Sequence, residues 1–205
     1  MRKVQQDGSG RLQKALLEGK EVAVRAEAAF LLGCLHAGSS AESLRHALSD
    51  GSARVRVEAA LALARLGDLQ TSLTVLKREL DGQLFADAPL RAARALALLG
   101  DASGYAKVVE ALESEFPSNR MEAIAVLPSF LPYAGRAAAG RPIDVIDRLI
   151  AAAGDAEPLL RRDALTALGA IDDGRARAAV KAAATGDPDP DVREFARQLV
   201  NRSSP

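Results

Sequence analysis

Several residue types are rare or absent in this chain, and each shortage excludes a class of protein. It has no Trp, and aromatic residues make up only 3% of its 205 residues. The single cysteine, Cys34, cannot form an internal disulfide, and no Cys/His spacing typical of a zinc site occurs. No apolar run approaches the roughly 18 residues that a membrane-spanning helix needs. We therefore expect neither a disulfide scaffold nor a structural zinc domain nor a membrane span.

An excess of charge of either sign is also missing. Lys and Arg together number 27, as do Asp and Glu. A dedicated nucleic-acid binder needs a clustered basic surface, so a nucleic-acid partner is not expected. The basic start of the chain is not followed by a long apolar run, which argues against a secretory signal. With only one cysteine, these features favour the cytoplasm.

What the chain has in abundance is alanine, leucine, arginine and glutamate, all good helix formers. One segment type recurs: an arginine opens an apolar helical pattern of small residues. The segments are 22–35, 53–68, 88–101, 118–130, 159–172 and 190–200. Their arginines are Arg25, Arg56, Arg91, Arg120, Arg161 and Arg193, which are 31, 35, 29, 41 and 32 residues apart. A repeat architecture follows from this period.

A second helical pattern lies between successive arginine segments. Its apolar residues recur at three-and-four spacing in 39–50, 68–80, 103–116, 141–153 and 173–185. Gly33, Gly67, Gly100 and Gly169 lie near the ends of the first helices, where a left-handed residue can close a helix. The Asp/Pro-rich stretch 186–192 is typical of a helix start. Each repeat is thus predicted to be a first helix, a turn and a second helix.

The strings "SARVRVEAALALARLGD" after Asp50 and "DPDPDVREFARQLV" carry a resemblance to a known family. The chain resembles the HEAT-repeat family, in particular the short bacterial repeats named after phycobilisome-lyase subunits. The resemblance implies an all-α fold, a right-handed α-α superhelix of about five helix pairs plus a terminal helix. It also implies first helices on the convex side, and second helices on a concave side that often binds a partner. In this family, an arginine and an aspartate of neighbouring repeats commonly form a ladder, and the six arginines match that position.

The repeat pattern predicts the following organisation. Residues 1–19 form an N-terminal segment and capping helix, with the helix at 11–18. Residues 20–201 form one repeat domain, with repeats at about 20–51, 52–85, 86–116, 117–156, 157–187 and 188–201. Residues 202–205 form a disordered tail.

Two joins break the pattern. Pro128 and Pro132 end or kink the helix of the fourth repeat, and Arg136 and Arg141 flank a loop of small residues. This segment is either an insertion folded over its neighbours or a partner-binding loop that uses Phe130, Tyr133 and the two arginines. In the stretch 79–89, Leu84 and Phe85 are expected to plug the space between repeats.

Enzyme chemistry finds little support in the sequence. Glu42 and His46 are four residues apart on one helix, but two ligands do not make a metal site. Cys34 is expected to be a buried structural thiol rather than a nucleophile. No His-Glu dipeptide occurs, which sets the chain apart from HEAT-like iron hydroxylases, and bilin-lyase-like or DNA-glycosylase-like activity remains the alternative. We predict no catalytic residue, no metal and no cofactor.

The favoured function is a non-catalytic, monomeric scaffold that binds a protein or peptide on the concave face or on the loop of the fourth repeat. The solvent side of the second helices supplies the candidate contacts. Their charges are mixed, which suits a protein better than a polyanion. Besides the loop residues named above, the candidates are Arg45, Lys77, Lys107, Asp144, Asp147, Arg148, Arg177 and Lys181.

Overall fold

The computed structural model describes residues 2–82, 88–138 and 140–202, and of residues 2–7 and 141 the backbone alone. Leu84, Phe85 and the end of the predicted tail, residues 203–205, lie outside this description. The chain folds as two compact units, Met1–Gly104 and Tyr105–Pro205. The boundary falls between the two helices of the third repeat, within the stretch 20–201 that the repeat pattern treats as one domain.

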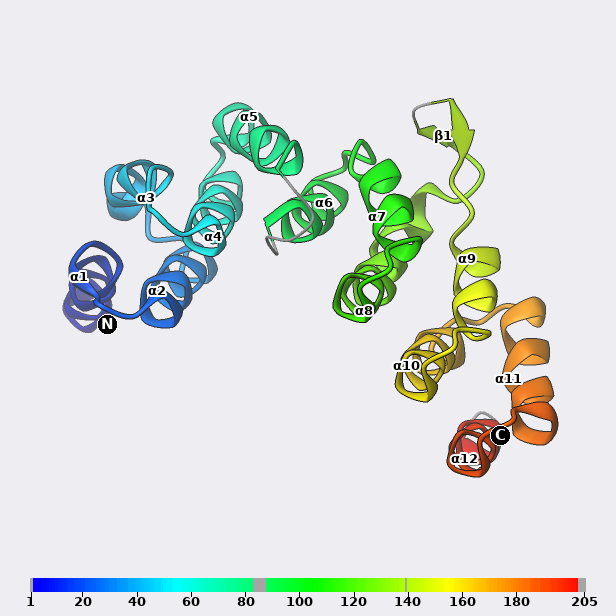
Figure 1. The fold of residues 1–205 in the computed structure, drawn as a ribbon. Helices are drawn as coiled ribbons and strands as arrows, with labels where there is room; N and C mark the ends of the chain where they lie inside the picture. Colours follow the sequence, from blue (N-terminus) through cyan, green and yellow to red (C-terminus); the bar gives the residue numbers. More distant parts are fainter. Residues whose placement is uncertain (1, 83–87, 139, 203–205) are drawn as a thin grey trace. The chain divides into compact units, whose positions relative to one another are not determined.

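The described residues are organised as pairs of helices. The first helices of the repeats, here called A helices, are α2 (Val22–Cys34), α4 (Ala53–Arg65), α6 (Ala88–Leu98), α8 (Pro117–Val126), α10 (Pro158–Gly169) and α12 (Pro190–Arg202). The second helices, or B helices, are α3 (Ala41–Ala47), α5 (Leu69–Leu80), α7 (Tyr105–Leu112), α9 (Val145–Ala152) and α11 (Gly174–Gly186). Within each unit the A helices form one row and the B helices a second row (Figure 1).

Helix α1 (Arg2–Glu18) precedes the first pair and packs against α2 and α3. It begins nine residues earlier than the predicted helix at 11–18, and it places Leu16 in the core. A short 3-10 helix, η1 (Gly38–Ser40), leads into α3.

The core of unit 1 is centred on α4, which packs against α2 on one side and α6 on the other. Its alanines let the neighbouring helices come close, as the pair Gly33 and Ala62 illustrates. A Cβ atom built on Gly33 would lie 2.8 Å from both Cα and Cβ of Ala62. Gly33 therefore serves the packing of α2 on α4, whereas the sequence suggested that it ends α2. The residue that adopts a left-handed conformation after α2 is His36, with φ of 48°.

Gly67 and Gly100 do end helices as predicted. Their φ angles are 96° and 94°, in the region that favours glycine. In each case the next residue turns back: the Asp68 amide donates to the Leu63 carbonyl, and the Asp101 amide donates to the Leu96 carbonyl, both at 2.9 Å. This geometry closes an A helix and starts the path to the B helix.

Unit 2 contains the irregular fourth repeat. Helix α8 ends at Val126, and the chain continues as a 3-10 helix, η2 (Leu127–Tyr133), because Pro128 and Pro132 lack the amide of an α-helical hydrogen bond. A two-stranded antiparallel ribbon follows, β1 (Ala137–Ala138) with β2 (Arg141–Pro142). The prediction that the prolines end the helix is confirmed.

The last A helix begins with both of the start signals that the sequence predicts. Helix α12 starts at Pro190, and the Asp189 carboxylate accepts hydrogen bonds from the amides of Asp191 and Val192 at 2.8 and 3.2 Å. Proline at the first helical position and aspartate before it are the predicted start signals. Arg202, assigned to the disordered tail from the sequence, is the last residue of this helix.

Candidate functional site

Four of the six recurring arginines form rungs with an acid of a following turn or helix. Arg25 Nε lies 2.7 Å from Asp50 Oδ2, and its Nη2 lies 3.0 Å from Oδ1. The same two-point geometry joins Arg120 to Asp155, at 2.7 and 3.0 Å, and Arg161 to Asp187, at 2.9 and 2.8 Å. The remaining Nη1 of each arginine donates to carbonyls five and six residues upstream. Each rung thus fixes the start of one A helix to the turn before the next.

The aspartates of these rungs also accept a backbone hydrogen bond within the turn. In Asp50, Asp155 and Asp187, the Oδ1 atom also accepts the amide two residues later, at 2.8–2.9 Å. The arginine hydrogen bonds lower the pKa of all three carboxyls, and burial opposes them only in part. The Arg161–Asp187 rung is the most enclosed, with side chains 7% and 4% exposed.

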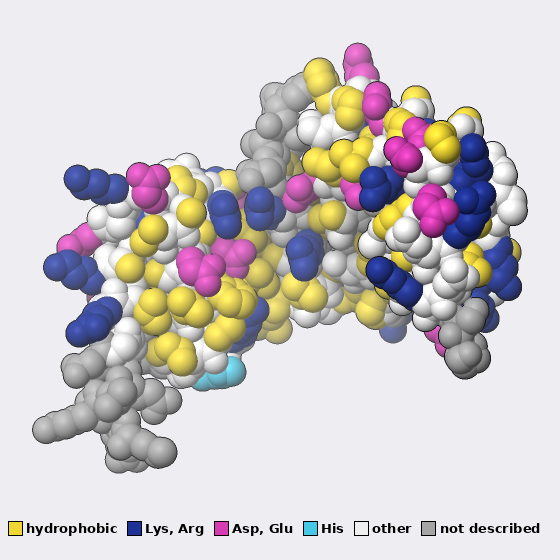
Figure 2. Space-filling model, turned by 90° about the horizontal axis from the view of Figure 1, so that it is seen from below, with side chains coloured by type: hydrophobic (Ala, Val, Ile, Leu, Met, Phe, Trp, Pro, Cys, Tyr) yellow, Lys and Arg dark blue, Asp and Glu magenta, His cyan; other side chains and the backbone are white. Residues whose placement is uncertain are grey.

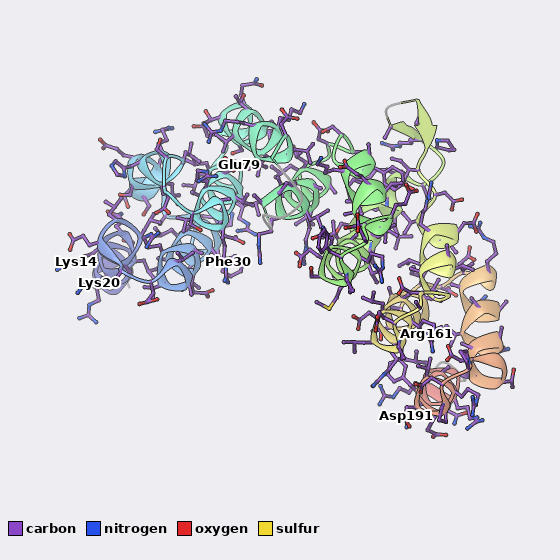
Figure 3. All side chains as sticks on the ribbon, in the orientation of Figure 1. Lys14, Lys20, Phe30, Glu79, Arg161 and Asp191 are labelled. Atoms are coloured by element: carbon purple, nitrogen blue, oxygen red, sulfur yellow. The ribbon has the colours of Figure 1, made fainter. Side chains whose placement is uncertain are left out.

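The second rung uses a different acid. Arg56 donates to Glu79, at 2.8 and 2.6 Å, and Glu79 belongs to the B helix α5 rather than to a turn (Figure 3). Its hydrogen bonds from Arg56 lower the pKa of the Glu79 carboxyl. Arg91 does not occupy the matching place in α6, because, counted back from Gly67 and Gly100, Pro89 corresponds to Arg56 and Arg91 corresponds to Glu58 on the outward stripe of α4. Arg193 lies in α12, the last described helix, where it donates to the carbonyls of Asp187 and Pro188 at 2.6 and 3.1 Å.

Most of the charged candidates on the B helices are engaged in ion pairs. Arg45 of α3 pairs at 3.1 Å with Asp68, the residue before α5, and Lys77 of α5 pairs at 2.8 Å with Asp101, in the turn after α6. Sequence reasoning missed both acids, although each follows the glycine that ends an A helix. In unit 2 the corresponding pairs are Arg148 with Glu113, at 3.5 Å, and Arg175 with Asp147, at 3.0 Å.

The other B-row candidates have local roles. Lys107 pairs with Glu110 on its own helix at 3.0 Å, Arg177 pairs with Asp172, and Lys181 is exposed on α11. Asp144 caps α9 by accepting the Asp147 amide at 3.2 Å. The neighbouring Asp144 carboxylate, together with burial, raises the pKa of Asp147, and Arg175 opposes this.

The aromatic candidates of the fourth repeat are not available to a partner. Phe130 is fully buried, and Tyr133 is 8% exposed. Phe130 lies between the rings of Tyr105 and Tyr133, at centroid distances of 5.5 and 6.3 Å. The prediction that these two side chains contact a partner is wrong, because η2 folds them into the core of unit 2. Arg136 is exposed, with its guanidinium 5.6 Å from the Tyr133 ring centroid, and Arg141 lies in β2.

Cys34 is exposed, so the prediction of a buried structural thiol is wrong. Among the residues whose side chains are described, no group of three or more His, Cys, Asp or Glu residues could hold a metal ion. Unit 2 contains a pocket of about 160 Å³ between α7, α8 and α9, and it lies beside the Arg120–Asp155 rung. Its polar lining residues are Glu113, Arg120, Arg148 and Asp155, which already pair with one another.

Exposed apolar side chains gather on the A helices instead. Ten large hydrophobic side chains are exposed among the residues that the structure describes, and eight of them lie on an A helix or at its end. These eight are Val22, Val24, Phe30, Leu35, Leu98, Phe116, Met121 and Leu159. Figure 2, seen from below Figure 1, looks onto the side of each unit that carries the A helices and shows hydrophobic side chains between charged ones. A sequence signal for this exposure is present, because Phe30, Leu98 and Leu159 lie three or four residues from Glu27, Arg94 and Arg162, on the same sides of their helices.

No helix in the described ranges is long and apolar enough to cross a membrane. A family model described as HEAT repeats matches residues 11–83 and 133–201. No curated protein matches the chain.

Three solved structures show how far the likeness in fold extends. The chain is similar to two engineered proteins, each with a TM-score of 0.50. One is 18% identical, with 95% of each chain covered; the other is 19% identical, with 93% of this chain and 97% of that chain covered. It is also similar to the complex of CpcE and CpcF of phycocyanin lyase from Nostoc sp. PCC7120. That TM-score is 0.49 and the identity 21%, over 97% of this chain and 77% of that chain. The two engineered proteins support the all-α solenoid and nothing more specific.

Proposed function

Since this chain belongs to the HEAT-repeat family, we propose that it is a non-catalytic scaffold that binds a protein partner. The Arg–carboxylate rungs hold successive helix pairs together, so the arginines that form them have a structural rather than a catalytic role. A catalytic group would be needed once, whereas a binding surface benefits from repetition. A cytoplasmic location fits an exposed thiol that has no second cysteine to pair with.

The observation that carries the proposal is the set of exposed apolar side chains along the A helices. Large apolar side chains left exposed to water can mark an interaction surface. Val24 and Phe30 are 48% and 38% exposed on α2, and Met121 and Leu159 are 42% and 59% exposed on α8 and α10. Burying them against a partner would remove apolar surface from water, which is the main driving force of association.

The A side supports partner binding better than the B side. On the B helices, Arg45, Lys77 and Arg148 pair with carboxylates of the turns beside neighbouring helices, and a partner would have to compete with those pairs. Of the large apolar residues there, Leu69 is exposed. In the loop of the fourth repeat, Arg136 remains an exposed candidate, but Phe130 and Tyr133 are buried and offer no aromatic contact to a partner.

The test is a titration with a purified partner. Proteins captured by the chain from its source cells would be purified and titrated against it by calorimetry. We expect saturable binding that weakens when Met121 and Leu159 are replaced by serine, while the helical circular dichroism is unchanged. Leu69→Ser is the matched control, because Leu69 is similarly exposed on a B helix. If no captured protein binds in the titration, the scaffold proposal fails.

A further inference from the structure

The outer face of the A helices in unit 1 carries an unusual mixture of arginine and apolar side chains. On α4, one stripe of the helix points outward at spacings of four, three and four residues. Helices α2 and α6 pack on either side of α4 and continue the surface. We call it the arginine–apolar face; it consists of Phe30 of α2, Arg54, Glu58, Leu61 and Arg65 of α4, and Arg91, Arg94 and Leu98 of α6.

Positive charge dominates this face. Glu58 lies in the field of Arg65, Arg91, Arg54 and Arg94, all of which favour its ionised form. Its pKa is nevertheless raised, because the loss of hydration on burial disfavours the carboxylate more than the four guanidinium groups stabilise it. Among the described residues, Arg54, Arg65 and Arg94 make no salt bridge with a carboxylate. These three cations are therefore available to an external anion.

Apolar groups border the cations. The Arg65 guanidinium lies 5.3 Å from the centroid of the Phe30 ring, within the range of a cation–π contact. Leu98 is 63% exposed beside Arg94 on α6. Arginine and aromatic residues together are the types enriched at the energetic centres of protein interfaces. Figure 3 marks Phe30 on the side of α2 away from the B helices.

We propose that the arginine–apolar face binds an acidic amphipathic peptide segment of a partner protein, an inference that rests on the scaffold function proposed above. Carboxylates of the segment would pair with Arg54, Arg65 and Arg94, and its apolar side chains would cover Phe30 and Leu98. Charge complementarity selects the acidic partner.

A peptide suits this face better than a nucleic acid does. Glu58 within the face and Glu27 on α2 would repel a continuous phosphate backbone, whereas a peptide can place apolar groups opposite them. Leu61 and Leu98 offer contacts to aliphatic side chains, which nucleic acids lack.

The experiment selects peptides from a displayed random library on the full chain. We expect enriched sequences to combine Asp or Glu with Leu or Phe. Their affinity should fall at least about tenfold in the variant Arg54→Glu with Arg94→Glu, since a reversed charge repels what the arginine attracted. The variant with glutamine at both positions should give an intermediate loss. The matched control is Arg175→Glu with Arg177→Glu on α11, for which we expect unchanged affinity.

Several outcomes would overturn the inference. Enrichment of basic or uncharged sequences would do so, as would acidic peptides that bind the Arg54/Arg94 variant normally. A single-stranded oligonucleotide that binds more tightly than the selected peptides would assign the face to nucleic acid. In these cases the scaffold function still stands if the purified partner binds in the calorimetric titration, so the two failures are distinguishable.

Discussion

Removing Asp187 should be the most damaging change to a single rung. Its carboxylate accepts two hydrogen bonds from Arg161, at 2.9 and 2.8 Å, and both side chains are buried. In Asp187→Ala, the guanidinium would stay enclosed without its counter-ion. Breaking a buried pair costs about 3–5 kcal/mol, and we expect the lower end, about 3 kcal/mol, because Nη1 keeps two backbone carbonyls.

The assay follows unit 2 alone. The chain has no Trp, and both tyrosines, Tyr105 and Tyr133, belong to unit 2, so tyrosine emission during urea unfolding reports on that unit. Asp172→Ala is the matched control, because Asp172 also pairs with an arginine but its side chain is 97% exposed. We expect little change in the free energy of unfolding there. Equal losses in the two variants would refute the argument from burial.

Replacing both members of the Arg161–Asp187 pair distinguishes the contribution of the ion pair from the cost of leaving one charge buried without its partner. Arg161→Met with Asp187→Leu removes both charges and keeps apolar volume, so it should cost less than Asp187→Ala alone. A larger loss in the double variant would show that the other hydrogen bonds of Arg161 matter more than the ion pair.

Three further predictions concern packing, pH and the thiol. Gly33→Ala should lower the free energy of unfolding by about 1–3 kcal/mol, because the new methyl group lies 2.8 Å from Ala62; Gly10→Ala, with open space around it, should not. The lowered pKa of Asp187 means that its stabilisation is present above the ordinary aspartate pKa of about 3.9 and is lost as the pH falls through the folded pKa. The free energy of unfolding, measured at a series of pH values across this range, should therefore fall less on acidification in Asp187→Ala than in the unmodified protein. Cys34 should react with a thiol reagent in the folded protein; reaction only after denaturation would contradict its exposure.

Much of the fold could be predicted because the signals are local and repeated. The arginine at the start of each A helix, and the left-handed glycines Gly67 and Gly100, are read from short strings. The Asp partners of Arg25, Arg120 and Arg161 all occupy the turn before the next A helix, a position that recurs.

The exceptions required knowledge of three-dimensional packing. Nothing local indicates that Arg56 pairs with Glu79, since Glu79 lies inside a B helix among other charged residues. The burial of Phe130 depends on the path of η2, and the prolines of that segment remove the helical period that would reveal an inward face.

The candidate site was harder to predict than the fold. Mixed charges on the B helices suggested a partner surface, but several of those charges meet acids such as Asp68 and Asp101 that lie far along the chain. The exposure of Cys34 could have been read from the sequence. Cys34 lies on the same helical stripe as Glu27 and Phe30, seven and four residues before it, and a charged residue marks a solvated stripe.

The most direct test of the central claim is a nuclear magnetic resonance map of the bound surface. The backbone amide and arginine side-chain signals of the chain would be followed as a selected acidic peptide is added. The account predicts that the largest shifts occur in α2, α4 and α6, with Arg54, Arg65 and Arg94 among them. Shifts concentrated in α3 and α5, or in residues 134–143, would contradict it.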